Sequence, residues 1–156
     1  FAKESAGREN PAFFMDCIRY EIDIQGIEPA PQGSKVRTRY GMREASKRVG
    51  PWRDAVRTEA LAARQPLIED ACKVTAEFRF LRPASHLTAK GLASKVYRQH
   101  YTVKRNDIDK VSRSTLDGLS GAAYADDCLV VELHASQRYC VPGERPGALI
   151  KIEEMQ

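Results

Sequence analysis

The sequence predicts an α+β fold, a single small domain in which a mixed β-sheet of about four strands packs with two main helices. Three observations support this prediction. The chain has 156 residues, 42% of them apolar, which is enough for one hydrophobic core. Four segments have the pattern of β-strands and two have the spacing of amphipathic helices. Their order is strand, helix, strand, helix, strand, strand, without an internal repeat, and this order is typical of α+β domains.

Four segments are predicted to form the sheet. They are residues 17–24, 73–81, 128–136 and 147–154. The first two alternate apolar and polar residues, as expected for strands with one face on a core. The third, CLVVELHAS, is strongly apolar and is therefore expected at the centre of the sheet. The fourth follows the turn-rich stretch VPGERPG.

Two segments have helical spacing. The first helix is predicted from about Pro51 to about Arg64, because proline is tolerated in the first turn of a helix. Its Trp52 is expected in the core or at an interface, and so is Tyr40 further upstream. The second helix begins near Ile108 and ends at a glycine-containing turn.

The charge is unevenly distributed along the chain, although the formal net charge is only +4. Residues 34–48 carry six cations against one acid, and residues 82–105 contain no acid at all. This pattern indicates an anionic partner, most simply a nucleic acid backbone, with solvated surface loops as the alternative. If residues 35–40 are extended, Lys35, Arg37 and Arg39 share one face. Residues 82–105 are expected to form a long loop.

Several other classes of protein are disfavoured. No stretch approaches the ~20 apolar residues of a membrane span, so we expect a cytoplasmic protein with no membrane partner. The four cysteines stand far apart, which predicts reduced, packed thiols and not a zinc site or a disulfide framework. Residues 1–15 have no periodic pattern and do not begin with Met. We interpret them as a tail or an added segment, with the domain at residues 16–156.

Two pairs of aspartates lie at opposite ends of the second helix, Asp107/Asp109 and Asp126/Asp127. One interpretation is structural, because acids stabilise helix starts through the helix dipole and populate turns. The other is functional: if the two ends meet, the clustered carboxylates would hold a hard cation such as Mg²⁺. Beside basic loops, that metal would face a phosphodiester. Arg113, which shares a helix face with Asp109, would assist the charge on the phosphate.

The stretch DIDKVSRSTLDGLSGAAYADDCLVVEL resembles the core motif of the RusA family of Holliday junction resolvases. That motif is approximately D-(L/I)-D-N-x-x-K-x-x-x-D-(A/G)-L, a short loop, then D-D-x-Q-V-V. The upstream GIEPAPQGSKVRTR and PWRDAV also look like the family, so the resemblance covers nearly all of residues 17–153. It implies a small homodimer that binds four-way DNA junctions and, with Mg²⁺ or alternatively Mn²⁺, nicks two strands symmetrically in DNA recombination and repair. Such a protein would work in a bacterial or phage-infected cell.

The resemblance also implies roles for individual residues. The catalytic, metal-binding aspartates would be Asp107, Asp109 and Asp127, and Arg113 stands where the family has an essential lysine. Two departures are Lys110 in place of Asn and Leu129 in place of Gln. These changes leave open a DNA-junction-binding protein of the same fold with impaired catalysis. The expected DNA-binding residues are Lys35, Arg37, Arg39, Lys104, Arg105 and Lys110.

Overall fold

The computed structural model describes residues 17–44, 46–92 and 100–155. The segment interpreted as a tail, residues 1–15, lies outside these residues, as does the stretch 93–99 of the basic region.

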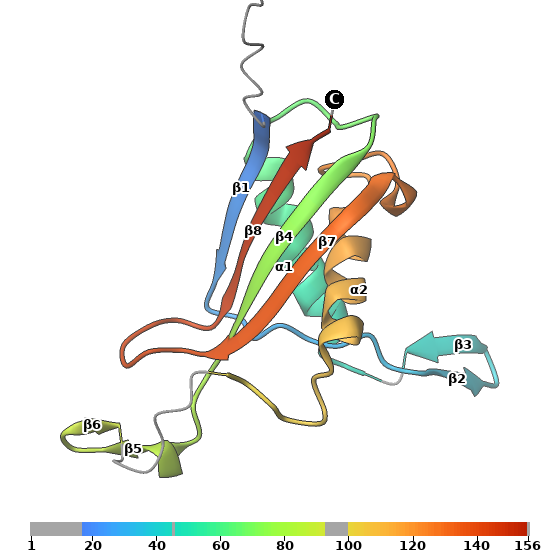
Figure 1. Cartoon of the computed structure of the whole chain (residues 1–156). Coiled ribbons are helices and arrows are strands. Elements are labelled where there is room, and N and C mark those ends of the chain that lie inside the picture. Colours follow the sequence, from blue (N-terminus) through green and yellow to red (C-terminus); the bar gives the residue numbers. More distant parts are fainter. Residues whose placement is uncertain (1–16, 45, 93–99, 156) are drawn as a thin grey trace, which may run out of the picture.

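A four-stranded mixed sheet with two helices on one face forms the body of the molecule (Figure 1). The strands, in their order across the sheet, are β1 (Cys17–Gln25), β8 (Gly147–Glu154), β4 (Cys72–Phe80) and β7 (Val130–Tyr139). β8 runs antiparallel to both β1 and β4, whereas β4 and β7 are parallel. The predicted α+β fold is therefore confirmed.

The core lies between the sheet and its two helices, α1 (Val49–Ala62) and α2 (Ile108–Leu119). Trp52 of α1 is completely buried there, and its indole N–H donates a 3.0 Å hydrogen bond to the hydroxyl of Thr115 on α2. The helices approach closely at Gly118, where an added Cβ would lie 3.1 Å from Val56. This packing fixes α2, and therefore the residues on its outer side, to the body of the molecule.

The strand predicted at the centre of the sheet is in fact at its edge. β7 pairs only with β4, apart from one isolated bridge between His100 and Arg138 among the described residues. The prediction rested on the apolar sequence of this strand, but Val131 and Leu133 remain 59% and 43% exposed. The last strand of the chain, β8, occupies a central position instead.

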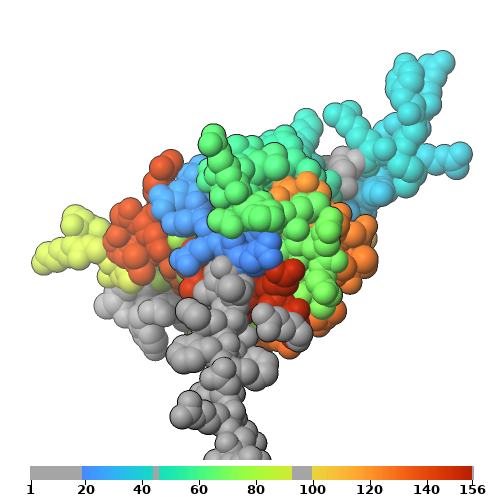
Figure 2. Space-filling view, turned by 90° about the horizontal axis from the view of Figure 1, so that it is seen from above, coloured from blue at the N-terminus to red at the C-terminus, as the bar shows by residue number. Residues whose placement is uncertain are grey.

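Two hairpins project from the body (Figures 1 and 2). One is formed by β2 (Lys35–Thr38) and β3 (Gly41–Glu44), and the other by β5 (Leu87–Thr88) and β6 (Gly91–Leu92) after a short 3-10 helix, η1 (Ala84–His86). Their turns are alike: the hydroxyls of Thr38 and Thr88 donate to the carbonyls of Gly41 and Gly91, at 2.8 and 3.1 Å. The prediction of one long loop after β4 is thus wrong for residues 84–92.

Several smaller expectations are also settled. Helix α1 begins at Val49, two residues before Pro51. Tyr40 is 93% exposed in the β2–β3 turn and so is not a core residue. Three cysteines have described side chains, and all three are free thiols; two are buried, but Cys128 is exposed and not packed as expected. No helix in the described part of the chain is long and apolar enough to cross a bilayer.

Candidate active site

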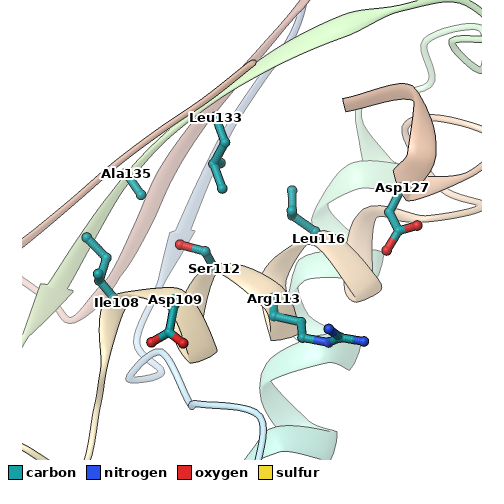
Figure 3. A pocket seen from close by; sticks show the side chains of 8 residues that line it. All are labelled: Ile108, Asp109, Ser112, Arg113, Leu116, Asp127, Leu133 and Ala135. Atoms are coloured by element: carbon teal, nitrogen blue, oxygen red, sulfur yellow. The ribbon is translucent and has the colours of Figure 1, made fainter. Parts of the chain in front are cut away.

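One open hollow lies between α2 and the edge strand β7 (Figure 3). Its volume is about 620 Å³. Eight residues line it: Ile108, Asp109, Ser112, Arg113, Leu116, Asp127, Leu133 and Ala135. The charged members are an arginine and two aspartates, and most of the others are apolar. The lining of the hollow therefore contains both charged and apolar side chains.

Helix α2 places Asp109 and Arg113 on its solvent side. The inner side of the helix carries Val111, Thr115 and Leu119, which are all buried. Asp109 and Arg113 are four residues apart and so lie one above the other on the outer side. Both are exposed, and Figure 3 shows both side chains on the outer side of α2. Neither makes a direct ion pair with any described residue.

The turn that follows α2 places Asp127. The backbone N–H of Ala125 donates to the carbonyl of Ile68 at 2.9 Å, and the Tyr124 hydroxyl donates to the Leu116 carbonyl at 2.8 Å. These bonds hold the turn against the body. Asp127 then begins a short 3-10 helix, η2 (Asp127–Leu129), whose preceding residue, Asp126, accepts a bond from the Cys128 N–H. The Asp127 carboxylate is at the Leu116 end of the hollow (Figure 3).

The charge around Asp127 is predominantly negative. The pKa of its carboxyl is raised, first by a hydrogen bond shared with the carboxyl of Asp126, then by partial burial and by the charges of Asp126 and Asp117. Arg113 acts in the opposite direction and lowers the pKa of Asp127. Donation from Cys128 instead lowers the pKa of Asp126. A cationic group placed beside Asp127 would therefore be stabilised by its surroundings.

The structure brings together three of the four predicted catalytic residues. Asp109, Arg113 and Asp127 line the same hollow, whereas Asp107 does not. Asp107 is the N-cap residue of α2, and its carboxylate Oδ2 lies 3.2 Å from the Nζ of Lys110. Asp107 and Asp109 were predicted to belong to one acidic cluster, but only Asp109 lines the hollow.

Asp109 and Asp127 lie toward opposite ends of the hollow. Asp127 is electrostatically coupled to Asp117, and Asp117 is eight residues beyond Asp109 on α2, which corresponds to about 12 Å along the helix axis. In Figure 3, the Arg113 side chain extends from the stretch of helix between them. Consistent with this separation, the described residues contain no group of three or more acids, histidines or cysteines that could hold a metal ion.

The predicted DNA-binding residues divide between two places. Lys35 and Arg37 lie on one side of β2, as predicted, but Arg39 lies in the turn and not in the strand. Lys104, Arg105 and Lys110 are all exposed around the start of α2. The sequence therefore indicated two groups of exposed cations. It did not indicate that one group lies on the β2–β3 hairpin and the other at the start of α2.

Sequence reasoning missed the apolar residues that line the hollow and the ion-pair partner of Asp117. Asp117 pairs with Arg53 of α1 at 3.1 Å and so joins the two helices. Helical spacing could have indicated Ser112, because it follows Asp109 by three residues. Leu133 and Ala135 could be recognised only once β7 was known to be an edge strand.

Comparison with protein families agrees with this geometry. A family model described as Endodeoxyribonuclease RusA matches residues 27–153. The match begins just after β1, ends within β8 and includes every residue that lines the hollow. No curated protein matches the chain significantly. On the strength of the family match, the chain belongs to the RusA endodeoxyribonuclease family of Holliday junction resolvases.

Proposed function

We propose that this protein is a Mg²⁺-dependent, structure-selective endodeoxyribonuclease that resolves four-way junctions by paired symmetric nicks. One observation carries the proposal: Asp109, Arg113 and Asp127 line a single solvent-open hollow. Carboxylates and a guanidinium in one open site are the groups that metal-assisted phosphodiester hydrolysis requires. DNA recombination and repair are the processes that supply such junctions.

Each carboxylate is an oxygen ligand that suits a hard divalent cation, but Asp109 and Asp127 lie toward opposite ends of the hollow and do not meet around one ion in this structure. Mg²⁺ is usually held by one or two carboxylates, with waters and substrate phosphate filling the remaining positions. Asp109 and Asp127 are exposed, so such a site stays open to water and substrate. Mn²⁺ accepts the same oxygen ligands. When bound, the cation supplies Lewis acidity toward the attacking water and the phosphate oxygens.

Arg113 would bind and orient the scissile phosphate. Its side chain reaches outward from α2 between the two carboxylates and makes no direct ion pair with a described residue, so its N–H donors are available to phosphate oxygens. A guanidinium there also stabilises negative charge that develops in the transition state. The neighbouring Ile108, Leu116 and Leu133 give the hollow an apolar side, which strengthens that electrostatic interaction.

A homodimer would supply the second nick, and the structure offers a surface for it. Trp52 and three apolar residues of β1, Tyr20, Ile22 and Ile24, are buried within the chain, so they are not available to a partner. The edge strand β7 exposes Val131, and it exposes Leu133, which lines the catalytic hollow. Isologous pairing over this edge would cover apolar surface and place the two hollows around one axis.

One observation favours the alternative function, a junction-binding protein with impaired cleavage. Asp107 is held by Lys110 outside the hollow, so the third carboxylate of the family's motif is not directed at the same place as the other two. Binding alone, however, gives no physical reason to keep two carboxylates in a hollow that faces phosphate. For this reason we place the enzyme first.

The two functions are separated by incubating the protein with a labelled four-way junction and with a linear duplex of the same sequence, with and without Mg²⁺. We expect symmetric nicks in opposite strands of the junction only, and only with the metal. Tight junction binding without any nick in Mg²⁺ or Mn²⁺ would establish the alternative. Light scattering at micromolar concentration should give twice the mass of one chain.

A further inference from the structure

A second hollow lies at the root of the β2–β3 hairpin, on another side of α2 from the catalytic residues. Its volume is about 350 Å³. Eight residues from three segments line it: Pro31, Gln32, Gly33, Ser34, Ser46, Arg48, Arg105 and Lys110. Three of the eight are cationic and none is acidic, so the lining has the composition of an anion site. It shares no residue with the catalytic hollow.

The cations of this root hollow are only partly neutralised. Arg48 lies 3.6 Å from Glu28, and Lys110 lies 3.2 Å from Asp107. Arg105 makes no ion pair with any residue that the structure describes. Three convergent cations therefore face two acids, both outside the lining, and their mutual repulsion is relieved when an anion enters.

The surroundings of the root hollow add to its preference for an anion. Arg48 is the N-cap residue of α1, and this helix has neither a side-chain cap nor an acid in its first turn. Cations at the positive end of a helix dipole are unfavourable unless an anion lies beside them. Two serine hydroxyls and the amide nitrogen of Gln32 supply neutral hydrogen-bond donors.

The root hollow is built before any ligand arrives. The backbone N–H of Gln32 donates to the carbonyl of Lys110 at 3.0 Å and so ties the loop before β2 to the first turn of α2. Arg48 is oriented by its bond to the carbonyl of Pro29. These bonds fix the backbone of the root hollow and one of its arginines, while the Lys110 and Arg105 side chains are exposed to solvent.

We infer that the root hollow binds a non-scissile phosphodiester of the DNA substrate and so fixes the register of the cleaved strand. This inference rests on the proposed function for the nature of the substrate. Asp109 and Lys110 are consecutive on α2, yet they line different hollows, so the first turn of one helix holds the reacting phosphate and an anchoring phosphate. The anchor would set which linkage enters the catalytic hollow. Lys110 is also where the sequence departs from the family motif, so this contact would be particular to this chain.

Methylphosphonate scanning tests the inference. One uncharged linkage is placed in turn at each position near the cut in a synthetic junction, and binding is measured without divalent metal. For the natural protein, we expect about a fivefold to tenfold loss of affinity at one or two linkages outside the cleaved one. Lys110→Asn should bind the unmodified junction more weakly and lose nothing further at those linkages, while other linkages keep their effect.

Two further variants make the result decisive. Arg105→Gln removes an exposed cation of the same hollow and should reproduce the Lys110→Asn pattern without touching the packing of α2. Lys151→Asn removes a lysine from the open face of the sheet and should leave the scan of the natural protein unchanged. If both hollow variants still lose affinity at the same linkages, or if no outer linkage matters, the inference is wrong.

The proposed function fails by a different outcome. A protein that nicks junctions but shows no outer phosphate dependent on Lys110 keeps its function and loses the root site. A protein that shows the dependent phosphate but nicks nothing keeps the root site and loses the function. The nicking assay therefore tests the proposed function, and the methylphosphonate scan tests the root hollow.

Discussion

The open face of the sheet and the surface around α2 are both rich in charged residues, but they use the charges differently. On the open face, two ion pairs join strands of the sheet: Lys73 with Glu153 at 3.5 Å and Arg79 with Asp23 at 2.6 Å. Around α2, Asp109, Arg105 and Arg113 make no ion pair with any described residue. Paired charges stabilise the fold. Unpaired charges that line a hollow are available to bind a ligand. The comparison agrees with the proposal that the α2 side carries the function.

The largest effect should follow from the unpaired carboxylates. Asp109→Asn and Asp127→Asn should each reduce junction nicking by about a hundredfold or more, because each removes a ligand charge from the catalytic hollow. Junction binding should stay the same or tighten, since a negative charge near DNA is lost. Single-turnover nicking and equilibrium binding measure the two quantities separately.

Asp126→Asn is a comparison for these substitutions, although it also removes the neighbouring charge that raises the pKa of Asp127. Asp126 is adjacent to Asp127 and exposed but does not line the hollow, and asparagine can still accept the bond from Cys128. We expect nicking within a few-fold of the natural protein. Nicking by Asp127→Asn at the natural rate would exclude that residue from the site.

Arg113 should have the next largest effect. Arg113→Ala should slow nicking by about tenfold to a hundredfold through the loss of transition-state stabilisation, with little change in binding. Arg113→Lys should recover part of the rate, because an ammonium keeps the charge but not the planar fork. If Arg113→Ala lowered affinity and left the saturated rate unchanged, Arg113 would be a phosphate anchor instead.

The paired side of the molecule should respond to acid through its stability. Arg138 donates two 2.7 Å bonds to Glu144, and this lowers the pKa of the Glu144 carboxyl to about 2. A carboxyl whose pKa is lowered by folding stabilises the protein above its unfolded pKa. That contribution is lost as the pH falls from about 4.5 toward about 2.

Urea unfolding across this pH window measures the contribution. The shift corresponds to about 3 kcal/mol for a fully shielded pair, and solvent around this half-buried pair reduces the expected value to about 1–2 kcal/mol. Glu144→Gln should cost that amount at neutral pH and progressively less toward pH 2. A pH-independent difference between the two proteins would show that the loss is due to packing and not to charge.

The smallest effects should come from the cations of the β2–β3 hairpin and its turn. Neutralising Lys35, Arg37 or Arg39 should weaken binding to all junction sequences alike and reduce the salt dependence by about one unit of slope per phosphate contact. Lys151→Asn on the open face serves as the control. An unchanged slope for the hairpin variants would identify these residues as solvated surface.

The sequence predicted the segments of the fold better than their arrangement. Alternation in β1 and β4 is a local property, so the strands could be recognised directly. The order of the strands depends on pairing between distant segments, and apolar character alone wrongly placed β7 at the centre. The β2–β3 hairpin was missed although Gly41, with a φ of 118°, directly follows its turn, Arg39–Tyr40, because the strands on either side are short and every residue of β2 is exposed.

In the candidate site too, spacing within one helix could be predicted, whereas the position of residues from distant segments could not. The four-residue spacing of Asp109 and Arg113 predicted their common side, and the structure confirms it. Asp107 is only two residues from Asp109, yet it is directed toward Lys110, because residues two apart on a helix do not share a face. The position of Asp127 depends on how the Tyr124 turn docks on the body, which no local pattern encodes.

The connection between β4 and β7 has a consequence for how such enzymes can diverge. The two strands are parallel, and the chain that joins them passes through the β5–β6 hairpin before it returns as α2. Loop-closure entropy rises slowly with length, by about 0.6 kcal/mol for each doubling of a flexible loop. The outer part of this crossover can therefore lengthen or shorten at little thermodynamic cost, while α2 stays locked to α1 through Trp52 and Gly118. Insertions there could change which DNA branches are reached without moving the aspartates.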